Sequence, residues 1–78
     1  MTVEVYGRQN CSFCTKAKTL LTIKKEDFIY KELDTDFTLE EFREKFPDAK
    51  TVPQIIVDGK HIGGYDALEA YYKNLEKD

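Results

Sequence analysis

Residues 3–14 read VEVYGRQNCSFC, and this stretch decides the fold. Residues 3–6 alternate apolar and polar side chains and are rich in strand formers, so they predict a β-strand. Residues 7–10 form a polar loop, and helical spacing begins directly after Cys11. Cys11 and Cys14 therefore stand where a strand and loop give way to a helix. Two thiols so placed are close enough to cycle between a dithiol and a disulfide.

The composition is that of a globular domain. The chain has 78 residues, of which 41% are hydrophobic and 35% charged, and these values predict one domain over residues 1–78. The formal net charge of −3 gives no basic surface for nucleic acid. The longest apolar runs are far too short to span a membrane. Because the strand pattern begins at once, we expect no signal peptide, a cytoplasmic protein and reduced cysteines.

The remaining periodicity predicts three more strands and three helices. The expected strands cover residues 28–33, 54–57 and 60–62, and the expected helices cover 12 to about 26, 38–46 and 66 onward. Thr38 with Glu41, and Asp66 with Glu69, fit capping boxes. The expected apolar stripes are Phe13, Ala17, Leu20 and Leu21; Leu39, Phe42 and Phe46; and Leu68, Tyr71, Tyr72 and Leu75.

The order β-α-β-α-β-β-α predicts a single α/β domain. The first β-α-β unit must be a crossover that makes its two strands parallel, and it should be right-handed. Asp58-Gly59 is a strong signal for a two-residue hairpin between the last two strands. We therefore expect a four-stranded mixed sheet flanked by three helices.

The two cysteines have different predicted roles. The unpaired N–H groups and the dipole at a helix start favour negative charge, so we expect a lowered pKa for Cys11 and assign it as the nucleophile. Arg8 can add positive potential if the loop folds over the site. Cys14, one turn into the helix and less exposed, is the resolving thiol. The alternatives are two cysteines that merely pack, or a zinc site, for which His61 is the single histidine.

Two further segments flank the predicted hairpin. In residues 51–53, Thr-Val-Pro, the backbone of Val52 could pair with an extended thiol peptide, although the residues alone favour an ordinary trans bond before Pro53. In residues 63–66, Gly-Gly-Tyr-Asp, two glycines let the backbone approach a ligand, and the following helix start can hold a carboxylate. The alternative for this segment is a plain turn with Asp66 as the helix cap.

Together these segments resemble a glutaredoxin. The resemblance covers nearly the whole chain and is closest to the short dithiol type of bacteria and their phages. It rests on three motifs in order: Gly7-Arg8-x-x-Cys11-x-x-Cys14-x-x-Ala17-Lys18; Thr51-Val52-Pro53-Gln54; and Val57-Asp58-Gly59-x-x-Ile62-Gly63-Gly64-Tyr65-Asp66.

The resemblance implies a thioredoxin-like fold, a cis bond before Pro53, and glutathione as the thiol co-substrate. Cys11 would form the mixed disulfide with glutathione, Arg8 would meet one of its carboxylates, and Val52 would pair with its cysteinyl unit. Tyr65 and Asp66 would hold its γ-glutamyl end. The full set of implied glutathione-binding residues is Arg8, Phe13, Thr51, Val52, Pro53, Gly64, Tyr65 and Asp66.

The implied activity is glutathione-dependent reduction of protein disulfides and glutathione mixed disulfides by a monomer, with ribonucleotide reductase as a partner by analogy. Ser12 and Phe13 depart from the usual Cys-Pro-Tyr-Cys motif. No metal is expected, but some relatives with serine at this place hold a [2Fe–2S] cluster between two chains, and Cys11 would then be its ligand. One alternative is therefore an iron–sulfur carrier or sensor, and the other is a redoxin recharged by thioredoxin reductase.

Overall fold

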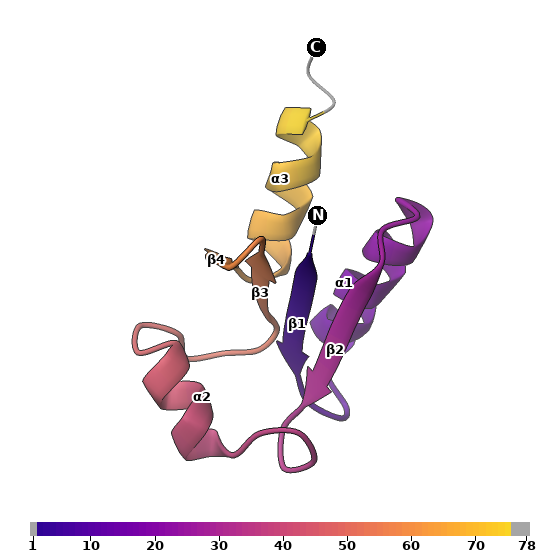
Figure 1. Ribbon diagram of the computed structural model, residues 1–78. Coiled ribbons are helices and arrows are strands. Elements are labelled where there is room, and N and C mark those ends of the chain that lie inside the picture. Colours follow the sequence, from indigo (N-terminus) through magenta and orange to yellow (C-terminus); the bar gives the residue numbers. More distant parts are fainter. Residues whose placement is uncertain (1, 76–78) are drawn as a thin grey trace.

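One mixed sheet of four strands organises the computed structural model, which describes residues 2–75 (Figure 1). The elements follow the expected β-α-β-α-β-β-α order. They are β1 (Val3–Gly7), α1 (Ser12–Ile23), β2 (Phe28–Glu32), α2 (Leu39–Lys45), β3 (Gln54–Val57), β4 (Lys60–Gly63) and α3 (Tyr65–Leu75).

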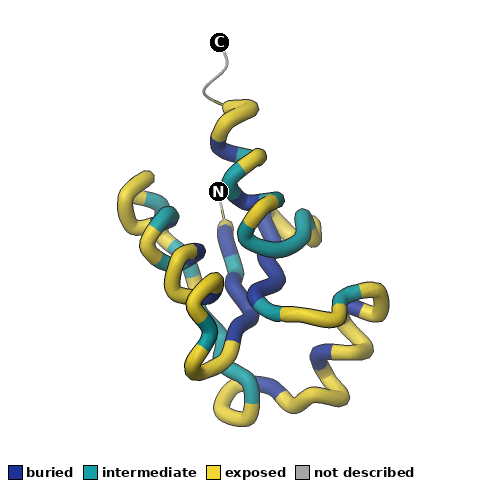
Figure 2. Tube along the Cα trace, turned by 180° about the vertical axis from the view of Figure 1, so that it is seen from behind, coloured by how far each residue is buried: buried dark blue, intermediate teal, exposed yellow. Residues whose placement is uncertain are grey.

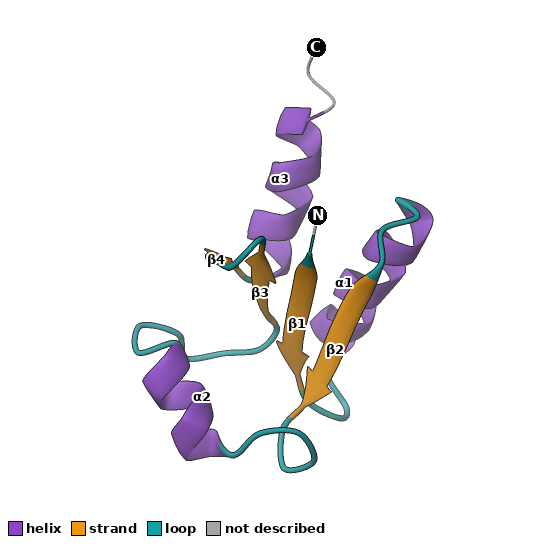
Figure 3. Cartoon of the chain, viewed as in Figure 1, coloured by secondary structure: helices purple, strands orange, loops and turns teal. Residues whose placement is uncertain are grey.

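The strand order across the sheet is β2-β1-β3-β4. β1 and β2 are parallel and α1 connects them, whereas β1 pairs antiparallel with β3, and β3 with β4. In Figure 3 the sheet lies between α1 and α3 on one side and α2 on the other. This is the thioredoxin-like architecture that the resemblance implies, so the predicted fold class is confirmed.

Alternation along the central strands divides the core into two clusters. Successive strand residues point to opposite faces, so Val5 packs toward α1 and α3 while its neighbour Tyr6 packs toward α2. The first cluster contains Val3, Val5, Ala17, Leu21, Ile55, Val57, Leu68 and Tyr72. The second contains Tyr6, Phe37, Phe42, Phe46 and Ile56. Figure 2 shows the buried residues concentrated along the strands and on one side of each helix.

One predicted capping box is confirmed and the other is wrong. At α2, the Glu41 N–H donates to Thr38 Oγ1 at 3.1 Å, and the Thr38 N–H donates to Glu41 Oε1 at 2.9 Å. At α3, the helix begins at Tyr65, so Asp66 lies inside the first turn rather than at the cap. The Leu68 N–H bonds to the carbonyl of Gly64, so the glycine supplies the start of the helix.

Three expected stripe residues are not in the core. Phe13, Leu39 and Leu75 are 51%, 46% and 58% exposed. Each lies in the first or last turn of its helix, where the apolar face of the helix extends past the core that packs against the sheet. Helical periodicity identifies the face correctly but cannot say how far along the helix the sheet extends.

The turns follow the expected chemistry. Asp58 and Gly59 both have positive φ, 51° and 81°, which suits a two-residue hairpin turn. The Val52–Pro53 bond is cis, as the resemblance implies and against the expectation from the residues alone. None of the helices in residues 2–75 has the length and apolar character needed to cross a membrane.

Candidate functional site

Cys11 is the N-cap of α1, and Cys14 lies in the first turn of that helix. The two sulfurs are joined as a disulfide with a Cα–Cα distance of 5.2 Å. The Cys14 N–H is one of the N–H groups at the helix start that have no partner within the helix. It donates to Cys11 Sγ at 3.2 Å. Cys11 is half-buried and Cys14 is 1% exposed, so an approaching substrate meets Cys11 first.

Gly7 makes room for the inner cysteine at the end of β1. A Cβ at this position would lie 2.9 Å from Cys14 Sγ and 2.5 Å from the hydroxyl of Tyr30. Any Cβ here would force one or both of these side chains to move, so glycine permits their close approach to β1. The Tyr30 hydroxyl donates to the Arg8 carbonyl at 3.4 Å, and burial, with a smaller effect of Glu32, raises its pKa.

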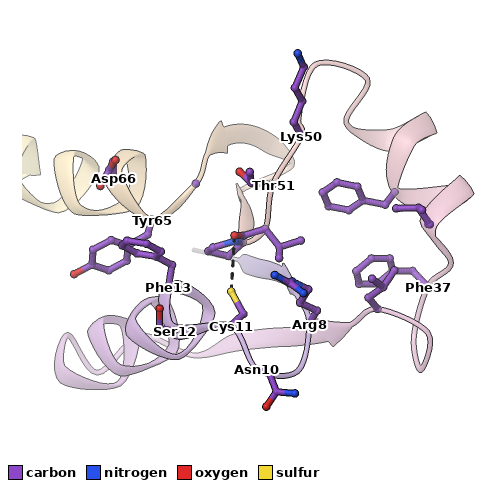
Figure 4. Close-up of a pocket in the computed structure, with 16 residues that line it drawn as sticks. Arg8, Asn10, Cys11, Ser12, Phe13, Phe37, Lys50, Thr51, Tyr65 and Asp66 are labelled. Atoms are coloured by element: carbon purple, nitrogen blue, oxygen red, sulfur yellow. Dashed lines mark hydrogen bonds between the residues drawn. The ribbon is translucent and has the colours of Figure 1, made fainter.

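The Thr-Val-Pro segment lies directly against the reactive sulfur. Cys11 Sγ is 3.8 Å from the carbonyl oxygen of Val52, the contact drawn as a dashed line in Figure 4. In the disulfide the sulfur has no hydrogen, so this is a van der Waals contact; in the reduced thiol the S–H can donate to that carbonyl. Gly64 packs on the same segment, because a Cβ there would lie 3.3 Å from the Pro53 carbonyl.

Side chains of α1 and α3 meet across the opening. The rings of Phe13 and Tyr65 are 6.1 Å apart at 40°, and the Lys16 ammonium lies 4.9 Å from the Phe13 ring. The Tyr65 hydroxyl donates to Glu69 at 3.4 Å. Desolvation, followed by the charge of Glu69, raises the pKa of Tyr65, so its hydroxyl stays protonated and remains a donor at neutral pH.

A single cleft of about 680 Å³ contains Cys11 and all eight of the expected glutathione-binding residues. They come from the loop before α1 with the first turn of that helix, the loop before β3, and the start of α3, three segments far apart in the sequence (Figure 4). Cys14 does not line the cleft and lies behind Cys11. The structure therefore brings the predicted residues together; what each one binds is a separate question.

Several residues lining the cleft were not expected from the sequence. They are Asn10, Ser12, Leu33, Phe37, Leu39, Phe42 and Lys50. Lys50 adjoins Thr51, so its place next to a motif could have revealed it. The apolar residues gave no such signal, because strand and helix patterns assign Leu33, Leu39 and Phe42 to the interior.

The cleft carries local positive charge. Arg8 and Lys50 are exposed, line the cleft, and form no ion pair with any residue in the range 2–75. Within the same range, no group of three or more His, Cys, Asp or Glu side chains is placed to hold a metal ion. Asp66 also lines the cleft, so its charged side chains sum to +1 and the site combines a half-exposed sulfur at a helix start with a small excess of positive charge.

Comparison with known proteins gives a consistent family. The glutaredoxin family profile matches residues 3–62. Glutaredoxin 1 of Rickettsia prowazekii is 40% identical over 99% of this chain and 79% of its own length. Glutaredoxin 1 of Escherichia coli K12 is 38% identical over 97% of this chain and 99% of its own. The structure of reduced Escherichia coli glutaredoxin superposes with a TM-score of 0.81 over 100% of both chains at 32% identity.

Proposed function

Because the chain belongs to the glutaredoxin family, and is therefore a thiol–disulfide oxidoreductase acting through its Cys11/Cys14 pair, we propose that it uses glutathione as its reductant. One observation carries this proposal. The Cys11 sulfur and the residues implied to bind glutathione, drawn from three segments, line one cleft. We further propose that the protein works in the cytoplasm, because a dithiol active as a reductant needs a reducing compartment. Following the family resemblance, we propose that it acts as a monomer.

The cleft offers complementary groups to each end of a tripeptide thiol. We assign the carboxylate of the glycine end to Arg8, and Lys50 lines the same cleft as a second cation. The backbone of Val52, next to Cys11 Sγ, would pair with the cysteinyl unit. The N–H groups at the start of α3 and the Asp66 carboxylate would hold the charged γ-glutamyl end. Phe13 and Tyr65 would form the wall of the cleft between the two ends of the tripeptide.

The proposed dithiol route uses both cysteines. The Cys11 thiolate attacks one sulfur of a protein disulfide; the S–S bond breaks and the first thiolate leaves and takes a proton. Cys14 then attacks Cys11 Sγ, releases the second protein thiol and forms the Cys11–Cys14 disulfide. One glutathione attacks this bridge, which frees Cys14 and leaves a mixed disulfide on Cys11. A second glutathione then attacks the glutathionyl sulfur, so oxidised glutathione leaves and Cys11 is again a thiolate.

The proposed monothiol route uses Cys11 alone. Cys11 attacks the glutathionyl sulfur of a protein mixed disulfide, and the protein thiol leaves. A second glutathione then attacks the glutathionyl sulfur and restores the Cys11 thiolate. The burial of Cys14 behind Cys11 supports this division, because only Cys11 faces an incoming disulfide. By family analogy we include ribonucleotide reductase among the protein disulfides reduced by the dithiol route.

The test is reduction of a glutathionylated cysteine peptide, followed through glutathione reductase and NADPH. We expect Cys11→Ser to abolish turnover, because the attacking sulfur is gone, and Cys14→Ser to retain it. A parallel assay replaces glutathione with thioredoxin reductase, and we expect no turnover there. Full activity in Cys11→Ser, or recharging only by thioredoxin reductase, would contradict the proposal.

A further inference from the structure

The cleft extends on both sides of Cys11, and the two sides differ in chemistry. On one side lie Tyr65, Asp66 and the start of α3; on the other lies Phe37 (Figure 4). We call the second side the apolar limb, and it consists of Leu33, Phe37, Leu39 and Phe42. No side chain of the apolar limb has a hydrogen-bonding group.

The apolar limb has a firm floor and an exposed rim. The rings of Phe37 and Phe42 stack at 5.9 Å and 23°, and both are nearly buried against Tyr6 and Phe46 of the second core. Leu39, the first residue of α2, is 46% exposed at the rim. A stacked aromatic floor beneath an exposed leucine presents apolar surface to solvent beside the reactive sulfur.

Glutathione does not account for this limb. Its polar ends carry two carboxylates and an ammonium group, which need partners such as those on the other side of Cys11 or the cations Arg8 and Lys50. Figure 4 shows Arg8 between Cys11 and Phe37, so a positive charge lies where the limb meets the reactive sulfur. A ligand that fills the limb must therefore bring an apolar group, with negative charge close to it.

We propose that the apolar limb binds a large apolar side chain that neighbours the cysteine of an extended, acidic segment in the partner protein. A carboxylate of the same segment faces Arg8, which lies between Cys11 and the limb. In the dithiol route no glutathione is present when the protein disulfide is attacked, so Arg8 is free for the partner at that step. This inference rests on the proposed function only in taking Cys11 as the attacking thiol.

The experiment therefore uses no glutathione. Reduced protein is mixed in single turnover with the homodisulfide of a short, end-blocked cysteine peptide, and acid-quenched samples are separated by chromatography. One protein dithiol and one peptide disulfide give one Cys11–Cys14 disulfide and two peptide thiols, which balances without another reductant. The peptides carry leucine or glycine beside the cysteine, and the readout is the ratio of their rate constants, leucine over glycine.

We expect a ratio of about five in the wild type, because partial burial of a leucine side chain favours the complex by about that factor. Leu39→Gln keeps the side-chain length and the helix propensity but removes the apolar rim, and it should lower the ratio to about two or less. The matched control is Ile23→Gln, which alters a 68% exposed apolar residue at the far end of α1 and should keep the wild-type ratio.

A wild-type ratio near one, or a ratio unchanged in Leu39→Gln, would overturn the inference. An equal fall of the ratio in Ile23→Gln would also overturn it, since the effect would then not be specific to the apolar limb. A second peptide pair, with glutamate or glutamine two residues from the cysteine, tests the acidic part. At low salt the glutamate peptide should react faster than the glutamine peptide. Equal rates would show that the partner needs no carboxylate. Loss of glutathione-coupled turnover alone would contradict the proposed function and leave these ratios standing.

Discussion

The position of one sulfur atom distinguishes Cys11 from Cys14. Its sulfur caps α1, accepts the N–H of Cys14 at 3.2 Å, and remains half-exposed. A thiolate at this position gains a hydrogen bond and the favourable end of the helix dipole, whereas a neutral thiol gains less. Cys14, 1% exposed in the first turn of α1 and packed against Gly7, is shielded from an incoming disulfide. The asymmetry of the pair therefore follows from position rather than from residue type.

We expect the pKa of Cys11 in the reduced protein to lie below the value of about 8.5 for a free cysteine. The thiolate is then present above the lowered pKa and lost as the pH falls through it, so the alkylation rate should drop at that lower pH. The measurement is iodoacetamide alkylation against pH, resolved by mass spectrometry, with Cys11→Ser as the control for Cys14. A midpoint at or above the free value would contradict the role assigned to the helix start.

At the scale of elements, two hydrogen bonds through the Gln54 side chain, here called the Gln54 relay, join the β3–β4 hairpin to the loop that carries Val52. Gln54, 6% exposed, donates from Nε2 to the Thr51 carbonyl at 2.8 Å, and its Oε1 lies 2.7 Å from His61 Nε2. The His61 ring also packs on Phe46 at 4.6 Å. His61 is thus more than an exposed strand residue, because it fixes the orientation of the amide that holds the loop.

Gln54→Leu should raise KM for a glutathionylated peptide about five-fold with little change in kcat. The reason is that losing a net hydrogen bond of about 1 kcal/mol loosens the Thr51-Val52 backbone but leaves Cys11 in place. Steady-state kinetics measure this effect. His61→Phe keeps a ring on Phe46 and the Gln54–Thr51 bond, so its effect should be smaller. A kcat loss with unchanged KM in Gln54→Leu would show that the relay serves the chemistry instead.

At the scale of the whole molecule, the net charge and the local charge have opposite signs. The chain carries −3, yet Arg8 and Lys50 stand unpaired within residues 2–75 at the cleft. Charges farther apart than about 10 Å are largely screened at 0.1 M salt, so the charged side chains that line the cleft, Arg8, Lys50 and Asp66, outweigh the distant acidic surface at Cys11. The two cations should therefore attract an anionic substrate despite the acidic surface.

Raising the salt from about 0.01 to about 0.2 M should lower kcat/KM for a glutathionylated peptide several-fold, because the cations are screened. Single-turnover reduction of the neutral bis(2-hydroxyethyl) disulfide should change little over the same range, which makes it the control. Rates for both substrates are followed in one salt series. A rate that rises with salt for the anionic substrate would mean that the overall negative charge governs its approach.

The sequence by itself determined the order of elements, the fold class and the segments of the site. Alternation in residues 3–6, the Thr38 capping box and Asp58-Gly59 are local signals, and local physics was enough to interpret them. The shift of Asp66 from cap to first turn shows the limit, since Gly64 could start the helix equally well.

Only the tertiary structure decided which residues face the cleft. Periodic stripes place Phe13 on the apolar face of α1, and Leu39 and Phe42 on that of α2, but the extent of the sheet decides where each face stops being covered. The apolar limb and the Gln54 relay join residues from separate elements, and no local pattern records such a meeting. Burial and contact depend on how elements pack, and packing is a property of the whole chain.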